Sequence, residues 1–95
     1  MLYLNFILIM RYTITEFDIF NAITCVGQEN KFLWDSANSE DLEVETRMEC
    51  EEKILKKIKK YLKKEHNLIG LDITDDDILY VWDDYYHDLC KLIDN

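Results

Sequence analysis

The chain contains no proline and only two glycines, Gly27 and Gly70, among its 95 residues. These two residue types interrupt helices and strands most strongly, proline because it lacks a backbone N–H and glycine because of its conformational freedom. Long regular elements with few sharp breaks are therefore expected. The length fits a single domain spanning residues 1–95. The apolar fraction of 48% supplies one hydrophobic core, so a disordered chain is not expected.

Helix signals predict a mainly α fold, a small compact helical domain with a long central helix and an amphipathic acidic C-terminal helix. The first helix is predicted over residues 15–26. Thr15 and Asp18 have the spacing of a capping box, with Asp in place of the usual Glu. Gly27 supplies a C-terminal stop, since glycine is the commonest residue just past a helix end.

The next segment, residues 27–38, is expected to be a loop that the apolar run Phe32–Trp34 anchors to the core. Ser36 or Ser39 would then cap the central helix, which is predicted over residues 40–65. Apolar positions are sparse in the first half of this helix. That half is therefore expected to project from the core or to pack on something outside this chain.

An α+β arrangement is the alternative fold. A strand or core-docked segment is expected within residues 3–14, although residues 1–9 would be an upstream extension if Met10 were the natural start. Residues 68–73 and 31–34 would be further strands. The β-rich composition of residues 23–26 and 31–34 also leaves a hairpin open as an alternative to helix and loop.

Charge is strongly segregated along the chain. Residues 40–52 carry a net charge of −6, residues 53–64 carry +7 and residues 65–95 carry −8, within a total of −9. Acidic residues early and basic residues late in one helix suit its macrodipole. The seven lysines of residues 53–64 are therefore expected to balance the acidic half of the same helix or the acidic C-terminal helix, with weak RNA binding as a minor option.

The last helix is predicted over residues 75–93, with Thr74 or Asp75 as its cap. At 100° per residue, one face forms an apolar arc made of Ile78, Val81, Trp82, Tyr85, Leu89, Leu92 and Ile93. Two acidic rows border this arc, one of Asp77, Asp84 and Asp88 and the other of Asp76 and Asp83, with Tyr80 and His87 between them. Lys91 is the only basic residue after Lys64, so ordinary surface salt bridges do not explain these rows.

The residue patterns argue against catalysis. Neither His66 nor His87 stands in a Ser-His or Cys-His arrangement, and no metal-ligand or phosphate-loop pattern occurs, so no enzyme, metal or cofactor is expected. Three widely spaced cysteines predict reduced thiols in a cytoplasmic protein. The charge of −9 disfavours direct binding to nucleic acid or to a membrane, because both require a basic surface.

The leading functional hypothesis is an acidic protein that inhibits a basic host protein by occupying its nucleic-acid-binding surface. In size, charge and Asp-rich helices the chain resembles the small acidic proteins that phages and mobile elements encode against host nucleases, such as anti-CRISPR proteins and DNA-mimic inhibitors. The expected partner-binding residues are Asp76, Asp77, Tyr80, Asp83, Asp84, His87, Asp88, Glu43, Glu45 and Glu49.

Spacing limits the mimicry. Asp77 and Asp84 are separated by roughly 10 Å along a helix axis, whereas duplex DNA carries one charge per about 1.7 Å. One helix is thus too sparse, and residues 40–52 would have to join the same surface. The alternatives are an antitoxin, immunity or anti-sigma-type partner protein, and a homo-oligomer in which residues 40–52 of one copy pair with residues 53–64 of an antiparallel neighbour.

Overall fold

The computed structural model of the chain describes residues 14–66 and 73–94, and this part consists of five helices. They are α2 (Glu16–Glu29), α3 (Lys31–Ala37), α4 (Val44–His66), α5 (Asp75–Asp84) and α6 (Tyr86–Asp94). The mainly α prediction is confirmed, and no strand occurs within the described ranges. The expected strand in residues 3–14, most of the one at 68–73 and the alternative start at Met10 fall outside them.

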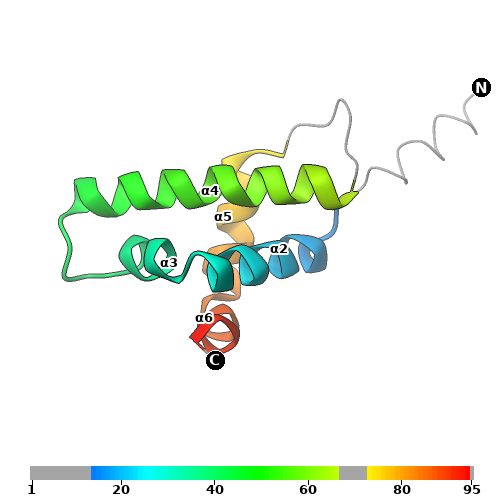
Figure 1. The fold of residues 1–95 in the computed structure, drawn as a ribbon. Coiled ribbons are helices and arrows are strands. Elements are labelled where there is room, and N and C mark those ends of the chain that lie inside the picture. The colour runs from blue at the N-terminus through cyan, green and yellow to red at the C-terminus, as the bar shows by residue number, and fades with distance from the viewer. Residues whose placement is uncertain (1–13, 67–72, 95) are drawn as a thin grey trace, which may run out of the picture.

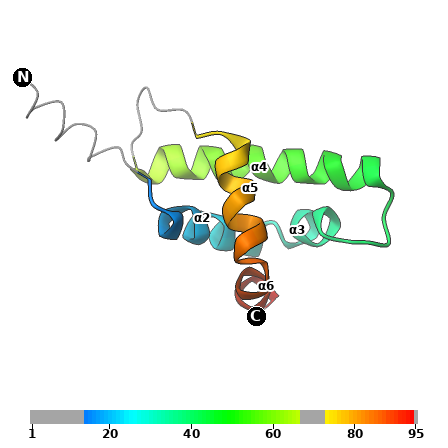
Figure 2. The same cartoon turned by 180° about the vertical axis from the view of Figure 1, so that it is seen from behind.

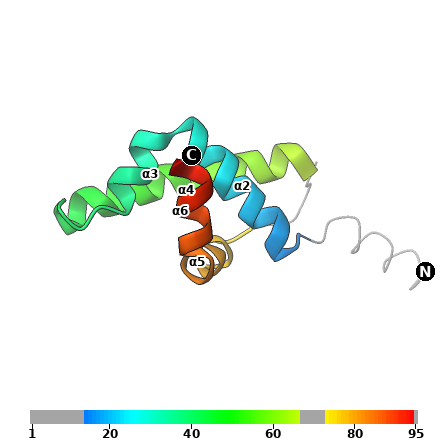
Figure 3. The ribbon, with the colours of Figure 1, turned by 90° about the horizontal axis from the view of Figure 1, so that it is seen from below.

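The helices form a layer with a crossing helix. α2 and α3 follow one another along α4 (Figure 1). α5 crosses this layer on one side, as the view from behind shows (Figure 2). α6 turns away from α5 and packs against α2 (Figure 3). The core lies where these helices meet, and its largest fully buried side chains are Trp34, Ile23, Ile54, Ile58, Leu62, Ile78, Leu89 and Val81.

Two complete capping boxes fix the starts of α2 and α5. The Asp18 N–H donates to the Thr15 hydroxyl oxygen over 3.2 Å, and the Thr15 N–H donates back to the Asp18 carboxylate over 3.0 Å. Thr74 and Asp77 repeat the arrangement, each bond spanning 3.2 Å. Both predicted helix starts are confirmed. Each box satisfies backbone donors that the first turn of a helix leaves free.

The predicted stop at Gly27 is wrong, because α2 continues through this residue to Glu29. Gly27 is buried, and a Cβ atom placed on it would lie 2.5 Å from Cδ1 of Ile93. The glycine is therefore used for close packing of α6 on α2. α2 ends instead at Asn30, whose side-chain amide donates to the Val26 carbonyl oxygen over 2.9 Å.

The expected loop over residues 27–38, and the alternative strand over 31–34, are also wrong. Residues 31–37 form α3, so no hairpin can pair residues 23–26 with residues 31–34. Burial explains the helix: Trp34 and Ala37 are buried and lie three residues apart, on one face of a helical turn. The Asn38 amide donates to the Trp34 carbonyl oxygen over 2.7 Å and closes this helix as Asn30 closes α2.

The central helix begins later than predicted, at Val44 rather than at residue 40. Ser36 does not cap it, because this residue is buried inside α3. Ser39 also lies too early, and its hydroxyl accepts a hydrogen bond from the Asp41 N–H over 3.3 Å in the connecting turn. The prediction that the early half lies outside the core is confirmed, since Val44 and Met48 are 58% and 62% exposed.

The predicted helix over residues 75–93 is divided at Tyr85 into α5 and α6. Tyr85 is held against α2, where its hydroxyl donates to Glu16 over 2.9 Å and its ring meets Phe20 edge-on at 5.9 Å. The change of direction lets Leu89 and Ile93 face α2. The predicted apolar arc is therefore wrong at Leu92, which is turned outward and is 43% exposed.

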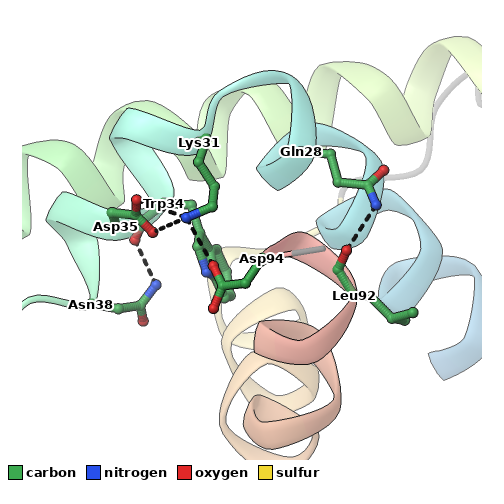
Figure 4. Close-up of polar contacts among 7 residues, drawn as sticks. All are labelled: Gln28, Lys31, Trp34, Asp35, Asn38, Leu92 and Asp94. Carbon is green, nitrogen blue, oxygen red and sulfur yellow. Dashed lines mark hydrogen bonds and ion pairs between the residues drawn. The ribbon is translucent and has the colours of Figure 1, made fainter.

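Polar contacts attach the end of α6 to α2 and α3 (Figure 4). The Gln28 side chain donates to the Leu92 carbonyl oxygen over 2.9 Å. Lys31 bridges Asp35 and Asp94, each at 2.8 Å. These groups are largely exposed, so we expect them to orient α6 more than to stabilise it.

The contact between Gly27 and Ile93 generates a stability prediction. Gly27→Ala gains about 1 kcal/mol in helix propensity, but it overpacks the site at a cost of roughly 1–3 kcal/mol. We expect a lower free energy of unfolding in the wild-type background, measured by urea denaturation. Ile93→Val removes Cδ1, the closest atom. Combining the two substitutions should recover about 1 kcal/mol relative to additivity. Additive effects would show that α6 does not pack on Gly27 in solution.

Candidate protein-binding surface

A dense group of negative charges lies on α5. Five of its ten residues are Asp, none is basic, and all five are exposed. Asp75 forms an ion pair with Lys59 of α4 at 2.7 Å, and Asp77 is engaged in the capping box. Within the described ranges, no cation lies within 4 Å of the remaining carboxylates, those of Asp76, Asp83 and Asp84. We call α5's outward side, with these three residues, Asp77 and Tyr80, the acidic face.

One edge of the acidic face lies beside the start of α2. The hydrogen bond that Tyr85 donates to Glu16 raises the pKa of Tyr85, and the negative charges of Glu16 and Asp84 raise it further. Glu16 and Asp84 are therefore gathered around one hydroxyl although 68 positions separate them in the sequence. Tyr80 also contributes to the raised pKa of Tyr85, and its own side chain is 59% exposed.

The other edge of the acidic face lies beside α4. Burial raises the pKa of Glu51, and the negative charges of Asp83 and Asp75 raise it further. The crossing of α5 over α4 thus collects three carboxylates, of which Asp75 alone has a cationic partner in the described part of the chain. Glu16 and Glu51 were absent from the predicted partner-binding set, because neither lies near Asp83 or Asp84 in the sequence.

The predicted residues of α6 are exposed but belong to a different axis. Asp88 stands in the first turn of α6, where a carboxylate interacts favourably with the helix dipole. His87 is exposed, and its ring centre lies 6.2 Å from that of Tyr86. The break at Tyr85 separates both residues from the row of Asp77 and Asp84, so the predicted single row of three carboxylates is wrong (Figure 3).

The predicted glutamates of the central segment are exposed at a separate place. Glu43 precedes α4, while Glu45 and Glu49 belong to its early half. This end of α4 extends away from the point where α5 crosses it (Figure 2). Within residues 40–52, Glu51 lies close enough to α5 for the negative charges of Asp83 and Asp75 to raise its pKa. The condition that the whole acidic segment joins the acidic face is not met, because the early half of α4 extends away from the crossing.

The lysine-rich half of α4 has a mixed role. Lys59 pairs with Asp75 at 2.7 Å, and Lys56 pairs with Glu52 at 3.9 Å. These two contacts agree with the expected balancing of the acidic segments. Lys57, Lys60 and Lys64 instead line a pocket between α4 and the end of α2.

The two histidines and the three cysteines all lie within the described ranges. His66 lies 4.0 Å from Asp18, and the three cysteines are free thiols of intermediate burial. Hydrogen bonds from the Thr15 backbone and hydroxyl lower the pKa of Asp18 against an opposing effect of burial, and the charge of His66 lowers it further. No described group of three or more His, Cys, Asp or Glu side chains is arranged to hold a metal ion. None of the described helices is long and apolar enough to cross a membrane.

The burial of Glu51 and its repulsion by Asp83 and Asp75 generate a pH-dependent prediction. Because the pKa of Glu51 is raised above its ordinary value of 4.5, folding favours the protonated form. The stability tied to this group is present below the unfolded pKa and is lost as pH rises through the folded pKa. We expect Glu51→Gln to increase the free energy of unfolding at pH 7 by roughly 0.5 kcal/mol, and the gain to disappear below about pH 4.

Glu52→Gln is the matched control, because it removes the same charge one residue away and leaves the crossing intact. Glu52 is exposed and faces Lys56 at 3.9 Å, so this substitution should give no stabilisation. Thermal unfolding of both variants at pH 4 and pH 7 makes the comparison. Equal shifts for the two variants would contradict a local repulsion at Glu51.

Comparison with known proteins finds no matching family model, no similar curated protein and no similar solved structure.

Proposed function

We propose that the acidic face of α5 is the docking surface for a basic region of another protein, and that the chain acts as a protein–protein inhibitor. The observation that carries this proposal is a set of three carboxylates around the exposed ring of Tyr80, none of which has a cation within 4 Å in the described part of the chain. Glu16 and Glu51 extend the negative potential on either side. A stable fold has no need to keep like charges this close, since they destabilise it.

A basic partner would relieve this repulsion. Complementary charge steers two proteins together and raises the association rate, while a rigid aromatic side chain supplies much of the contact energy. Tyr80 is 59% exposed and lies on a regular helix, so little backbone freedom is lost on binding. The acidic face therefore combines a long-range attraction with a short-range anchor.

The partner class that fits best is a nucleic-acid-binding protein, because such proteins present Lys and Arg side chains arranged for phosphates. Competition does not require a copy of the duplex. α5 has ten residues, a length of roughly 15 Å, over which duplex DNA would carry about nine charges. We therefore propose occupation of the basic surface through ordinary interface contacts. Inhibition of a host nuclease by a phage or mobile-element protein is the specific form that we favour.

The test is affinity capture from a host lysate with three versions of the chain. Asp76→Asn/Asp83→Asn/Asp84→Asn removes these three charges of the acidic face and leaves the capping residue Asp77 and the ion-paired Asp75 in place. Glu43→Gln/Glu45→Gln/Glu49→Gln removes the same amount of charge elsewhere and is the matched control. A partner of the proposed kind is retained by wild type and control, loses at least tenfold in affinity for the α5 variant, and is displaced by a duplex oligonucleotide.

Two outcomes would contradict the proposal. Equal losses for both variants would mean that only the total charge matters. A partner that no oligonucleotide displaces would rule out the proposal that the chain blocks a nucleic-acid-binding surface. Circular dichroism of each variant checks that α5 still folds, since removing repulsion should preserve or increase its helix content.

A further inference from the structure

A pocket with a positive rim lies on this acidic protein, between the end of α2 and the last turns of α4. It has a volume of about 340 Å³ and is lined by Val26, Glu29, Asn30, Lys57, Lys60, Tyr61 and Lys64. The volume lies at the lower end of the range of sites that bind small molecules in proteins, and the hollow is shallow and open to solvent, with all three lysines exposed. The spacing of three, four and seven residues along α4 brings the three lysines to one side of that helix.

The three ammonium groups of the pocket are uncompensated in the described part of the chain. No carboxylate oxygen there lies within 4 Å of Lys57, Lys60 or Lys64, whereas Lys56 and Lys59 of the same helix both form ion pairs. The helix dipole accounts for Lys64, which stands in the last turn of α4. It does not account for Lys57 and Lys60, because the dipole effect fades beyond one turn. Including Glu29, the lining carries a formal charge of +2.

The floor of the pocket is apolar. Val26 is 3% exposed, and the ring of Tyr61 packs against the core. A hydrogen bond between the Tyr61 hydroxyl and the Cys25 thiol, together with burial, raises the pKa of Tyr61 to about 12. Tyr61 therefore stays neutral at physiological pH and adds no negative charge to the site.

Two acceptor groups complete the lining. The Asn30 side-chain nitrogen is committed to the Val26 carbonyl oxygen, so its Oδ1 atom is the part of the amide that can accept a hydrogen bond from a ligand. The Glu29 carboxylate is a second acceptor at the same end of α2. Acceptors beside a cluster of ammonium groups suit a ligand that carries hydroxyl or amino groups as well as an anion.

We propose that this pocket binds a small phosphorylated molecule of the nucleoside monophosphate class, with its phosphate at Lys57, Lys60 and Lys64. A phosphate monoester brings a charge between −1.5 and −2 and three acceptor oxygens, which match the net charge and the three ammonium donors of the lining. A planar ring packs over the partly exposed ring of Tyr61, and the sugar hydroxyls donate to Glu29 and Asn30. The pocket and the acidic face do not share residues, so this proposal stands or falls independently of the proposed function.

The test uses AMP, inorganic phosphate and adenosine as probes in isothermal titration calorimetry at constant ionic strength. AMP is expected to bind the wild-type protein more tightly than inorganic phosphate does, and adenosine is expected not to bind detectably. Lys57→Gln/Lys60→Gln/Lys64→Gln should weaken AMP binding at least tenfold. Lys53→Gln/Lys56→Gln/Lys63→Gln is the matched control, because it removes three charges from the same helix without touching the lining, and its AMP affinity should stay within about twofold.

Several results would overturn the proposal. Absence of AMP binding at millimolar concentration would do so, as would equal losses for the two triple variants, which would reveal general attraction of anions to α4. Equal affinity for AMP and inorganic phosphate would show that the ring adds nothing to binding and would rule out a nucleoside monophosphate as the ligand. The last measurement is the oligomeric state, determined by sedimentation at low and high salt. A dimer that dissociates at high salt and is absent for the Lys57/Lys60/Lys64 variant would show that these lysines pair with glutamates of a second copy, which would overturn the proposal. Circular dichroism confirms that each variant is folded.

Discussion

The contact between Trp34 and Trp82 holds the two parts of this fold together. Their ring centres lie 4.7 Å apart, and both side chains are almost fully buried. The Trp82 indole N–H donates to Oδ1 of Asn38 over 3.0 Å, while the amide nitrogen of the same Asn38 closes α3. One asparagine thus terminates a helix and satisfies a buried donor on the helix that crosses it. Beside this pair, the buried Ile78 and Val81 are the other side chains that attach α5 to the layer.

This arrangement explains how a helix with five aspartates can be stable. Ile78, Val81 and Trp82 form a fully apolar inner side, so the adhesion of α5 does not depend on its outer side. Its outer side is then free to carry charge at a modest cost in stability. The lysines of α4 are distributed in a comparable way, since two of them compensate carboxylates and three face a pocket.

Features encoded within a few residues were predictable from the sequence. Thr15 with Asp18, and Thr74 with Asp77, fix helix starts through bonds spanning three positions, and both starts were predicted. The prediction failed where distant segments decide the local structure. Gly27 stays helical because Ile93 packs on it, and the helix breaks at Tyr85 because Glu16 and Phe20 hold that ring.

The residues of the candidate site were likewise predictable only in part. The exposed carboxylates of α5 follow from helical periodicity and were predicted. Glu16 and Glu51 join them only through the crossing of three helices, so no local pattern could indicate either residue. Asp88 and the glutamates of residues 43–49 were grouped with α5 on the assumption of one straight helix and one continuous surface. The break at Tyr85 and the direction of α4 remove both assumptions.

The docking of α6 on α2 also imposes an order on folding. Gln28 and Leu92 are 64 residues apart, and closing a loop of that length costs roughly 4 kcal/mol in chain entropy. Helices α3 and α4 are neighbours in the sequence and can associate early, whereas α6 can be held only after the segments between them are in place. The helix of the acidic face lies inside this loop. Local opening that releases α6 would therefore loosen one end of the acidic face while leaving the α2–α4 layer folded.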